Sequence, residues 1–136
     1  MTDPERALQA AILARLKSDG ASTAVLGGRI WDQPPGDGHP YEYPHLLFSR
    51  CETRPLGADG GEYEHRLTLT AVSRYGGSEE AKRAAAAVRA ALDGASLSPS
   101  GWRCVSLTVT FSDTYRAADL RTSYGVLRLR AVTEAA

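Results

Sequence analysis

The sequence has few cysteines, no excess of charge of either sign and no long apolar run. Its 136 residues carry 16 basic and 16 acidic side chains, so the formal net charge is zero. A neutral chain does not attract nucleic acid through bulk charge, and near-neutrality favours self-association. No apolar stretch is long enough to span a membrane. Cys51 and Cys104 form neither a CxxC pair nor a metal-binding spacing, so we expect free thiols rather than a disulfide.

Sequence motifs of catalysis, metal binding and nucleotide binding are also missing. The chain has no GxSxG elbow, no Walker or dinucleotide fingerprint, and no His, Cys or acidic residues at a ligand spacing. His39 lies in a loop rich in Pro and Gly, His45 adjoins the start of a strand, and His65 lies within a strand. Solvation or packing accounts for each histidine better than a role as a general base. We therefore expect no catalytic residues, no cofactor and no metal site.

The sequence does contain one strongly predicted helix, at residues 78–92. Ser78 is placed to cap its first free amides, and acidic residues follow in the first turn. Seven of the twelve residues from Ala81 to Leu92 are alanine, the best helix former, and Gly94 is suited to end the helix. The apolar positions recur at helical spacing: Ala81, Ala84, Ala85, Val88 and Leu92. We expect this small-sided face to pack closely on a sheet.

A second helix is predicted at the start of the chain. The residues Asp-Pro-Glu at positions 3–5 combine a capping side chain, a proline at the first helical position and an acid. Apolar residues then repeat every four positions at Leu8, Ile12 and Leu16, and Gly20 is expected to close the helix.

Five segments predict strands: residues 29–32, 45–50, 62–74, 104–112 and 126–131. The fourth alternates most clearly, which places its apolar residues on one face: Val105, Leu107, Val109 and Phe111. The element order is therefore α-β-β-β-α-β-β. Strict alternation predicts an α+β fold with a mainly antiparallel sheet and helices packed on one face. At this length we expect a single domain over residues 1–136.

The other face of the sheet is predicted to carry Thr, Ser and Arg side chains. Such a face can be solvated, can form an interface, or can line the channel of an oligomer. Two connections, residues 33–43 and 53–61, are rich in Gly and Pro or are polar, and we expect both to be irregular loops.

Several stretches together resemble one family. They are ALQAAILARL, GGRIWDQPP followed by PYEYPHLLF, EHRLTLTAVSRYGG leading into EEAKRAAAAVRAAL, and GWRCVSLTVTFSDTYR before YGVLRLRA. The chain resembles, over nearly its whole length, the tail-completion or tail-terminator proteins of long-tailed phages, and most closely the version found in gene transfer agents. The resemblance implies an α+β subunit of a ring, typically a hexamer. Such a ring caps the tail tube, ends its polymerisation and presents a surface to the head connector.

The resemblance also implies partners and a location. The partners are other copies of the chain, the tail tube protein and the head connector protein, with DNA only as passing cargo in the channel and no membrane. The protein is expected in the cytoplasm of the producing cell and then in the tail of a phage or phage-like particle. The family provides no catalytic residues to transfer to this chain.

In a tail terminator, mobile loops are ordered by a neighbouring subunit or by the last ring of the tube. We therefore expect Arg54, Leu56 and Asp59 to be disordered in the free subunit and to become fixed on assembly. Arg128 and Arg130 are expected to meet acidic groups across the subunit boundary or to line the channel. These five residues form the candidate assembly interface.

Two other interpretations remain open at this stage. A head-completion or connector subunit would also form rings but would stack on the portal side. A small intracellular hydrolase or transferase would use His39 or His65 near an acid, and it would need a concave pocket that holds the histidine with its partner.

Overall fold

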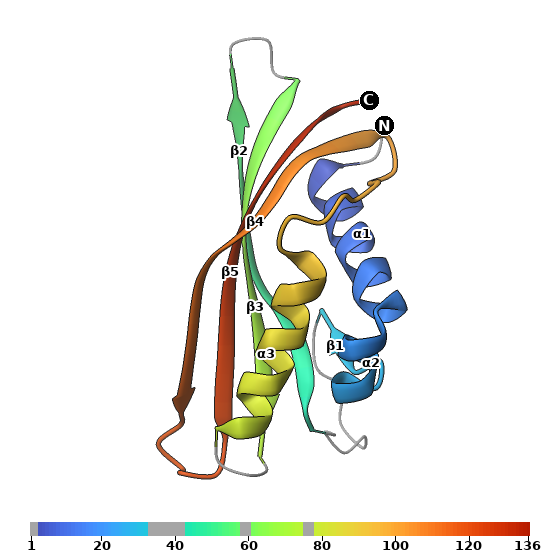
Figure 1. The fold of residues 1–136 in the computed structure, drawn as a ribbon. Helices are drawn as coiled ribbons and strands as arrows, with labels where there is room; N and C mark the ends of the chain where they lie inside the picture. The colour runs from blue at the N-terminus through green and yellow to red at the C-terminus, as the bar shows by residue number, and fades with distance from the viewer. Residues whose placement is uncertain (1–2, 33–42, 58–60, 75–77) are drawn as a thin grey trace.

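The computed structural model describes residues 3–32, 43–57, 61–74 and 78–136. In these residues, three helices cover one face of a five-stranded sheet (Figure 1). The elements are α1 (Pro4–Ser18), α2 (Gly20–Leu26), β1 (Ile30–Trp31), β2 (His45–Leu56), β3 (Glu62–Ser73), α3 (Glu79–Leu92), β4 (Trp102–Arg116) and β5 (Ser123–Ala135). The predicted order and the α+β fold class are confirmed, with α2 as an additional short helix.

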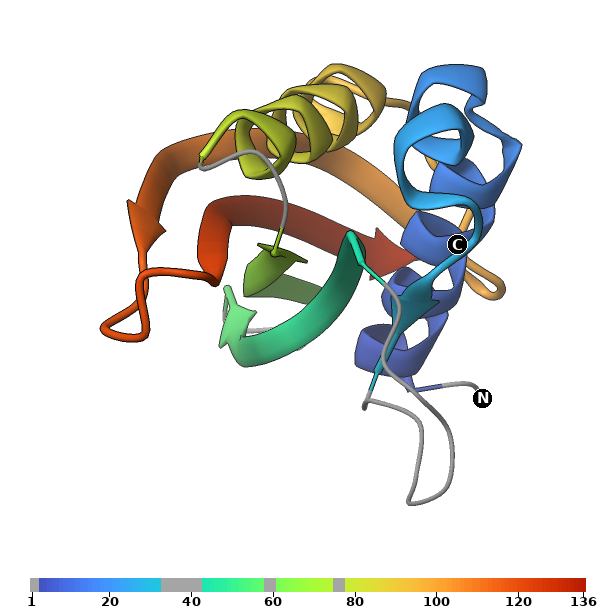
Figure 2. The same cartoon turned by 90° about the horizontal axis from the view of Figure 1, so that it is seen from below.

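The strand order across the sheet is β1-β2-β3-β5-β4. All neighbouring strands run antiparallel except β1 and β2, which are parallel over the two residues of β1. Helix α3 connects β3 to the edge strand β4, and β5 then returns between them. Viewed along the strands, the three helices lie on the same side of the curved sheet (Figure 2).

Helix α3 packs on the centre of the sheet through the face that its spacing predicts. Its predicted apolar residues are all buried, and Leu69, Leu107 and Leu129 on the facing strands are at most 2 % exposed. A Cβ added at Gly125 on β5 would lie 2.9 Å from the carbonyl oxygen of Ala81, so the absence of a side chain there lets the helix approach. The predicted cap is wrong in one respect, because the side chain of Ser78 makes no capping hydrogen bond.

Helix α1 begins as predicted and ends at Ser18, before the residue that was expected to close it. The carboxylate of Asp3 accepts a hydrogen bond from the backbone N–H of Arg6 at 3.4 Å. Gly20 does not close α1 as expected, because it is the first residue of α2. Asp19 separates the two helices, and its carboxylate accepts from the backbone N–H of Ser22 at 2.9 Å. The chain can therefore turn between two helices with the second one capped at once.

Three strands are longer than the sequence pattern predicts. Strand β2 continues through Leu56 in antiparallel register with β3, so the predicted loop at residues 53–61 is wrong for residues 53–56. Strand β4 continues through Arg116, beyond the predicted end at residue 112, and β5 extends on both sides of the predicted residues 126–131. In each case the partner strand supplies backbone hydrogen bonds that local composition does not reveal.

The predicted faces of β4 are partly wrong. The register to β5 shifts between Cys104 and Ser106 and again between Val109 and Phe111. Each bulge adds one residue and reverses the alternation beyond it. Leu107 is 2 % exposed as predicted, whereas Val105 is 55 % and Phe111 44 % exposed.

Candidate interaction surface

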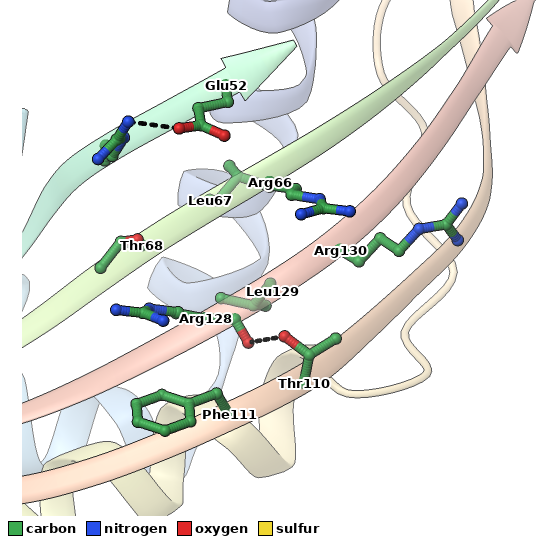
Figure 3. A pocket seen from close by; sticks show the side chains of 10 residues that line it. Glu52, Arg66, Leu67, Thr68, Thr110, Phe111, Arg128, Leu129 and Arg130 are labelled. Atoms are coloured by element: carbon green, nitrogen blue, oxygen red, sulfur yellow. Dashed lines mark hydrogen bonds and ion pairs between the residues drawn. The ribbon is translucent and has the colours of Figure 1, made fainter. Parts of the chain in front are cut away.

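The face of the sheet turned away from the helices is polar and rich in arginine, and we call it the outer face. Figure 3 looks onto this face, with the helices behind the sheet. Its central strands alternate outward polar residues with buried leucines, as Arg66, Leu67 and Thr68 do on β3. The alternation that buries one side of the sheet therefore collects the charged groups on the other.

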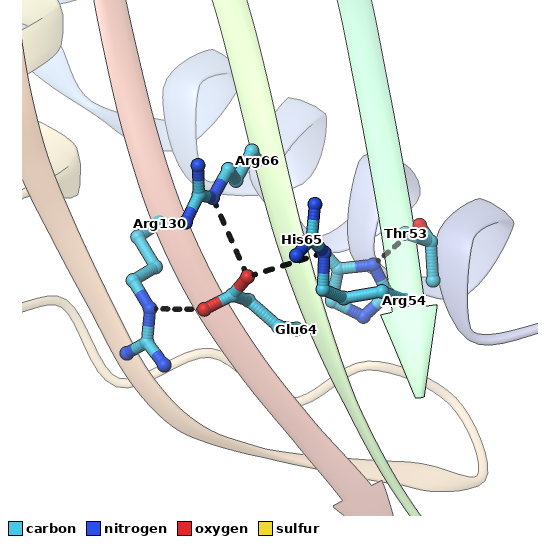
Figure 4. Close-up of polar contacts among 6 residues, drawn as sticks. All are labelled: Thr53, Arg54, Glu64, His65, Arg66 and Arg130. Atoms are coloured by element: carbon cyan, nitrogen blue, oxygen red, sulfur yellow. Dashed lines mark hydrogen bonds and ion pairs between the residues drawn. The ribbon is translucent and has the colours of Figure 1, made fainter. Parts of the chain in front are cut away.

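Glu64 on β3 binds arginines from three strands of the outer face (Figure 4). Arg130 on β5 donates through Nε to Oε2 of Glu64 at 2.7 Å. The Nε atoms of Arg66 and Arg54 lie 3.4 and 3.8 Å from Oε1. Glu64 is 7 % exposed. The hydrogen bond from Arg130, followed by the charges of the arginines, lowers the pKa of Glu64, which stays ionised.

This carboxylate offsets a repulsion that strand pairing creates. Arg66 and Arg130 are directly opposite each other in the β3–β5 register, and like charges at such positions destabilise a sheet. Glu64 lies two residues before Arg66 on the same face and bridges both guanidinium groups. We call Arg54, Glu64, Arg66 and Arg130 the Glu64 cluster.

A hollow of ≈ 520 Å³ lies beside the Glu64 cluster on the outer face (Figure 3). Arg50 on β2 and Arg128 on β5 line it, and Arg50 is paired with Glu52. The guanidinium carbon of Arg128 stacks 4.8 Å from the ring centroid of Phe111. Threonine hydroxyls complete the polar lining at Thr68 and Thr110. The hollow can accept an anion, because four arginines and only one glutamate line it.

An aromatic pair continues this surface along β4 and β5. Tyr115 and Tyr124 are cross-strand partners with ring centroids 5.4 Å apart. Tyr115 is 48 % exposed. Arginine, tyrosine and phenylalanine are the residue types enriched in protein interfaces, and they are grouped here on one exposed face.

The structure brings together only part of the predicted assembly interface. Arg54 and Arg130 meet at Glu64, and Arg128 lies on the same face two residues from Arg130. Leu56 is half-buried and ends β2, while Asp59 lies outside the described residues. The expected disorder of Arg54 and Leu56 is wrong for this structure, because both residues are paired with β3.

Sequence reasoning missed several residues of this surface as site residues, among them Arg50, Glu64, Arg66 and Phe111. Glu64 and Arg66 lie at alternate positions of β3 with Thr68 and Thr70. The clear alternation of this strand therefore predicts that all four side chains lie on the same face. Phe111 was assigned to the buried face, because the bulge before it leaves no mark in the alternation.

His65 is buried and hydrogen-bonded at both ring nitrogens. Its Nδ1 lies 2.9 Å from Oγ1 of Thr53, and its Nε2 lies 2.8 Å from Oγ1 of Thr133. Thr53 donates its hydroxyl proton to Glu5 at 2.7 Å. Nδ1 of His65 is therefore the donor to Thr53, and Nε2 accepts from Thr133. Burial lowers the pKa of His65. These bonds connect the first turn of α1 to three strands.

The other groups considered for chemistry do not form a reaction centre among the described residues. His45 is 4 % exposed and stacks with Trp31 and Tyr43 at 4.9 and 5.1 Å. Burial raises the pKa of Cys51 to about 11, so its thiol stays protonated near neutral pH. His39 lies outside the described residues. Within the described ranges, no group of three His, Cys, Asp or Glu side chains is placed to hold a metal ion.

One further property concerns membranes. Among the described helices, none has the length and apolar character needed to cross a bilayer.

Comparison with known proteins identifies the family. Residues 10–134 match the family described as "Tail completion protein gp17". The chain belongs to this family. Among solved structures, it is similar to a chain of the "Virion of native gene transfer agent (GTA) particle" at 28 % identity and a TM-score of 0.87. That match covers 98 % of this chain and 99 % of the other. No curated protein matches.

Proposed function

We propose that this chain is a single tail-terminator-like domain over residues 1–136, and that copies of it form a ring, in our proposal a hexamer. The ring caps the tail tube, ends its polymerisation and joins the tail to the head. The observation that carries the proposal is the likeness to a chain of the gene transfer agent virion over nearly the full length of both chains. A head-to-tail contact between identical subunits closes into a ring when its rotation permits.

The proposed assembly interface contains Arg54, Leu56 and Asp59 at the boundary between subunits, and Arg128 and Arg130 where they line the channel. The side chains of Arg54 and Arg130 are 63 % and 44 % exposed, although both meet the buried Glu64. A guanidinium group has five N–H donors, more than its contact with Glu64 uses, so Arg54 remains available for a carboxylate of a neighbour. Leu56 would add apolar contact at the end of β2.

The partners in this proposal are further copies of the chain, the tail tube protein and the head connector protein, with DNA only as cargo that passes through the channel. The chain acts in the cytoplasm of the producing cell and then in the tail of the particle. It is a structural protein and not an enzyme, a role that agrees with the placement of His65, whose two ring nitrogens are occupied by hydroxyl groups.

The proposal is tested by adding the purified protein to polymerising tail tube protein. We expect the protein to bind tube ends and to stop growth at substoichiometric amounts, whereas Arg54→Gln/Leu56→Ser should fold but cap poorly. Arg83→Gln on the solvent-exposed side of α3 removes one exposed arginine and is the control for the lost charge. Unrestricted tube growth with the wild-type protein would contradict the proposal, and binding to head connectors alone would favour a head-completion ring.

A further inference from the structure

The strongest unassigned feature is an excess of positive charge around the hollow of the outer face. Five guanidinium groups surround it or the adjoining Glu64 cluster, against the carboxylates of Glu52 and Glu64. The arginines are Arg50, Arg54, Arg66, Arg128 and Arg130. Three positive charges are therefore left over around the hollow and the Glu64 cluster, whereas Glu62, Asp113 and Glu134 lie farther along the strands of the same face. The tertiary structure separates charges that the composition balances.

The two carboxylates do not saturate these donors. A guanidinium group has five N–H donors, and Glu64 presents only two oxygens to Arg54, Arg66 and Arg130. Arg128 is held by the ring of Phe111, which orients its planar group beside the hollow. Fixing a guanidinium group in this way lowers the entropy lost when it binds an anion.

Hydroxyl groups accompany the arginines on the same face. Thr68 and Thr110 line the hollow, where Thr110 donates its hydroxyl proton to the carbonyl oxygen of Arg128 at 3.2 Å. Ser49 donates its own to Thr70 at 2.7 Å on the neighbouring part of the sheet. Arginine, serine and threonine are among the side chains that contact phosphate oxygens in nucleic-acid complexes. The surface extends across β2, β3, β5 and β4, so it offers several charges to a long polyanion rather than one pocket to a small ion.

We propose that the outer face binds the phosphate backbone of DNA through Arg50, Arg66, Arg128 and Arg130, without reading base sequence. The inference deepens the proposed function, in which DNA is the passing cargo of the ring, by naming the face of the subunit that meets it. The similar solved chain belongs to a virion, a particle in which nucleic acid is the expected polyanion. A weak, screened contact of this kind guides a strand without holding it.

The test uses the purified full chain and a fluorescent DNA duplex of arbitrary sequence, with anisotropy measured from about 50 to 200 mM salt. Arg50→Gln/Arg128→Gln removes two exposed guanidinium groups, one of them ion-paired, and leaves the Glu64 cluster intact. Arg83→Gln/Arg89→Gln on α3 also removes two exposed guanidinium groups, of which that of Arg83 is ion-paired. Both lie on the opposite side of the sheet. This variant is the matched control for net charge.

We expect the outer-face variant to bind DNA at least about fivefold more weakly and to lower the slope of log K against log salt by about 2, while the α3 variant stays close to wild type. Equal losses in the two variants would overturn the proposal, as would an absence of binding by the wild-type protein at low salt. Displacement of the duplex by polyglutamate at equal charge concentration would also overturn it, in favour of an acidic protein partner. Tube capping is measured separately, so a protein that binds DNA but does not cap tubes would contradict only the proposed function.

Discussion

At the scale of single residues, Glu64 and His65 are neighbours on β3 that serve opposite faces of the sheet. Glu64 points to the outer face and binds three arginines (Figure 4). His65 points to the other face and binds two threonines, Thr53 and Thr133. Each connects β2, β3 and β5. The far end of the β2–β3 pair, which extends beyond the helices, is therefore held from both sides (Figure 1).

The first prediction concerns the titration of His65. Because burial lowers its folded-state pKa below the ordinary value of 6.5, the unfolded chain takes up the proton first as pH falls. The stability that neutral His65 contributes is thus present above about pH 6.5 and is lost as pH falls through the folded-state pKa. His65→Gln should remove this part of the pH dependence between pH 7 and 5.

Denaturant melts at several pH values measure the effect. The charged side chains that act on the ring are Glu5 and Asp3, and both work in the opposite direction by favouring the imidazolium form. The same slope of stability against pH in both proteins would show that His65 is not the titrating group. Tail assembly should continue with folded His65→Gln, and its loss would reopen a chemical role.

At the scale of elements, the bulges of β4 decide which of its side chains support α3. Leu107 lies in the core, while Val105 lies exposed two residues earlier. Leu107→Ala should therefore lower the free energy of unfolding by about 2–5 kcal/mol, as for other buried leucines. Val105→Ala should cost less than about 0.5 kcal/mol, the usual range for surface positions. Similar losses in the two variants would mean that the first bulge does not exist.

The contact between α3 and β5 gives a second prediction at this scale. An added Cβ at Gly125 would meet the backbone of Ala81, which cannot rotate away. Gly125→Ala should force α3 outwards and cost about 1–3 kcal/mol, the range for an overpacked core. Gly61→Ala has nothing within 4 Å of its new Cβ and serves as the control. An unchanged stability of Gly125→Ala would show that the helix shifts without loss of packing.

At the scale of the whole molecule, the sheet is covered on one face and open on the other. Its edge strand β4 is partly closed by α3, because the carboxylate of Asp93 accepts from the backbone N–H of Val109 at 2.9 Å. The N–H of Gly94 also donates to the carbonyl of Leu107 at 2.8 Å. These two bonds occupy edge groups that would otherwise pair with another strand. In the proposed ring, this part of the edge is therefore not available to a strand of a neighbouring copy.

The prediction at this scale is a closed assembly with a defined mass. Light scattering or native mass measurement across protein concentrations should show the subunit and one discrete ring, with no series of longer polymers, because a ring that closes leaves no free end. High salt should shift the balance towards the subunit if arginine pairs hold the contact. A continuous distribution of masses would contradict a closed ring.

The sequence by itself determined the elements whose signal is local. The alanine-rich composition and helical spacing of α3, and the uninterrupted alternation of β3 and β5, depend only on neighbours along the chain and were read correctly. The missing motifs likewise followed from the residues alone. Pairing between strands decided the rest, since β2 extends to Leu56 and β4 to Arg116 only because partner strands bond them.

Tertiary structure also decided the composition of the surface. A bulge turns Phe111 outwards, and its extra residue is visible only against the register of β5. Arg54, Arg66 and Arg130 come from three strands far apart in the sequence, and only the sheet brings them to Glu64. The balanced composition does not reveal the local excess of arginines around the hollow. The net charge of a chain counts its charges and does not say where on the surface they lie.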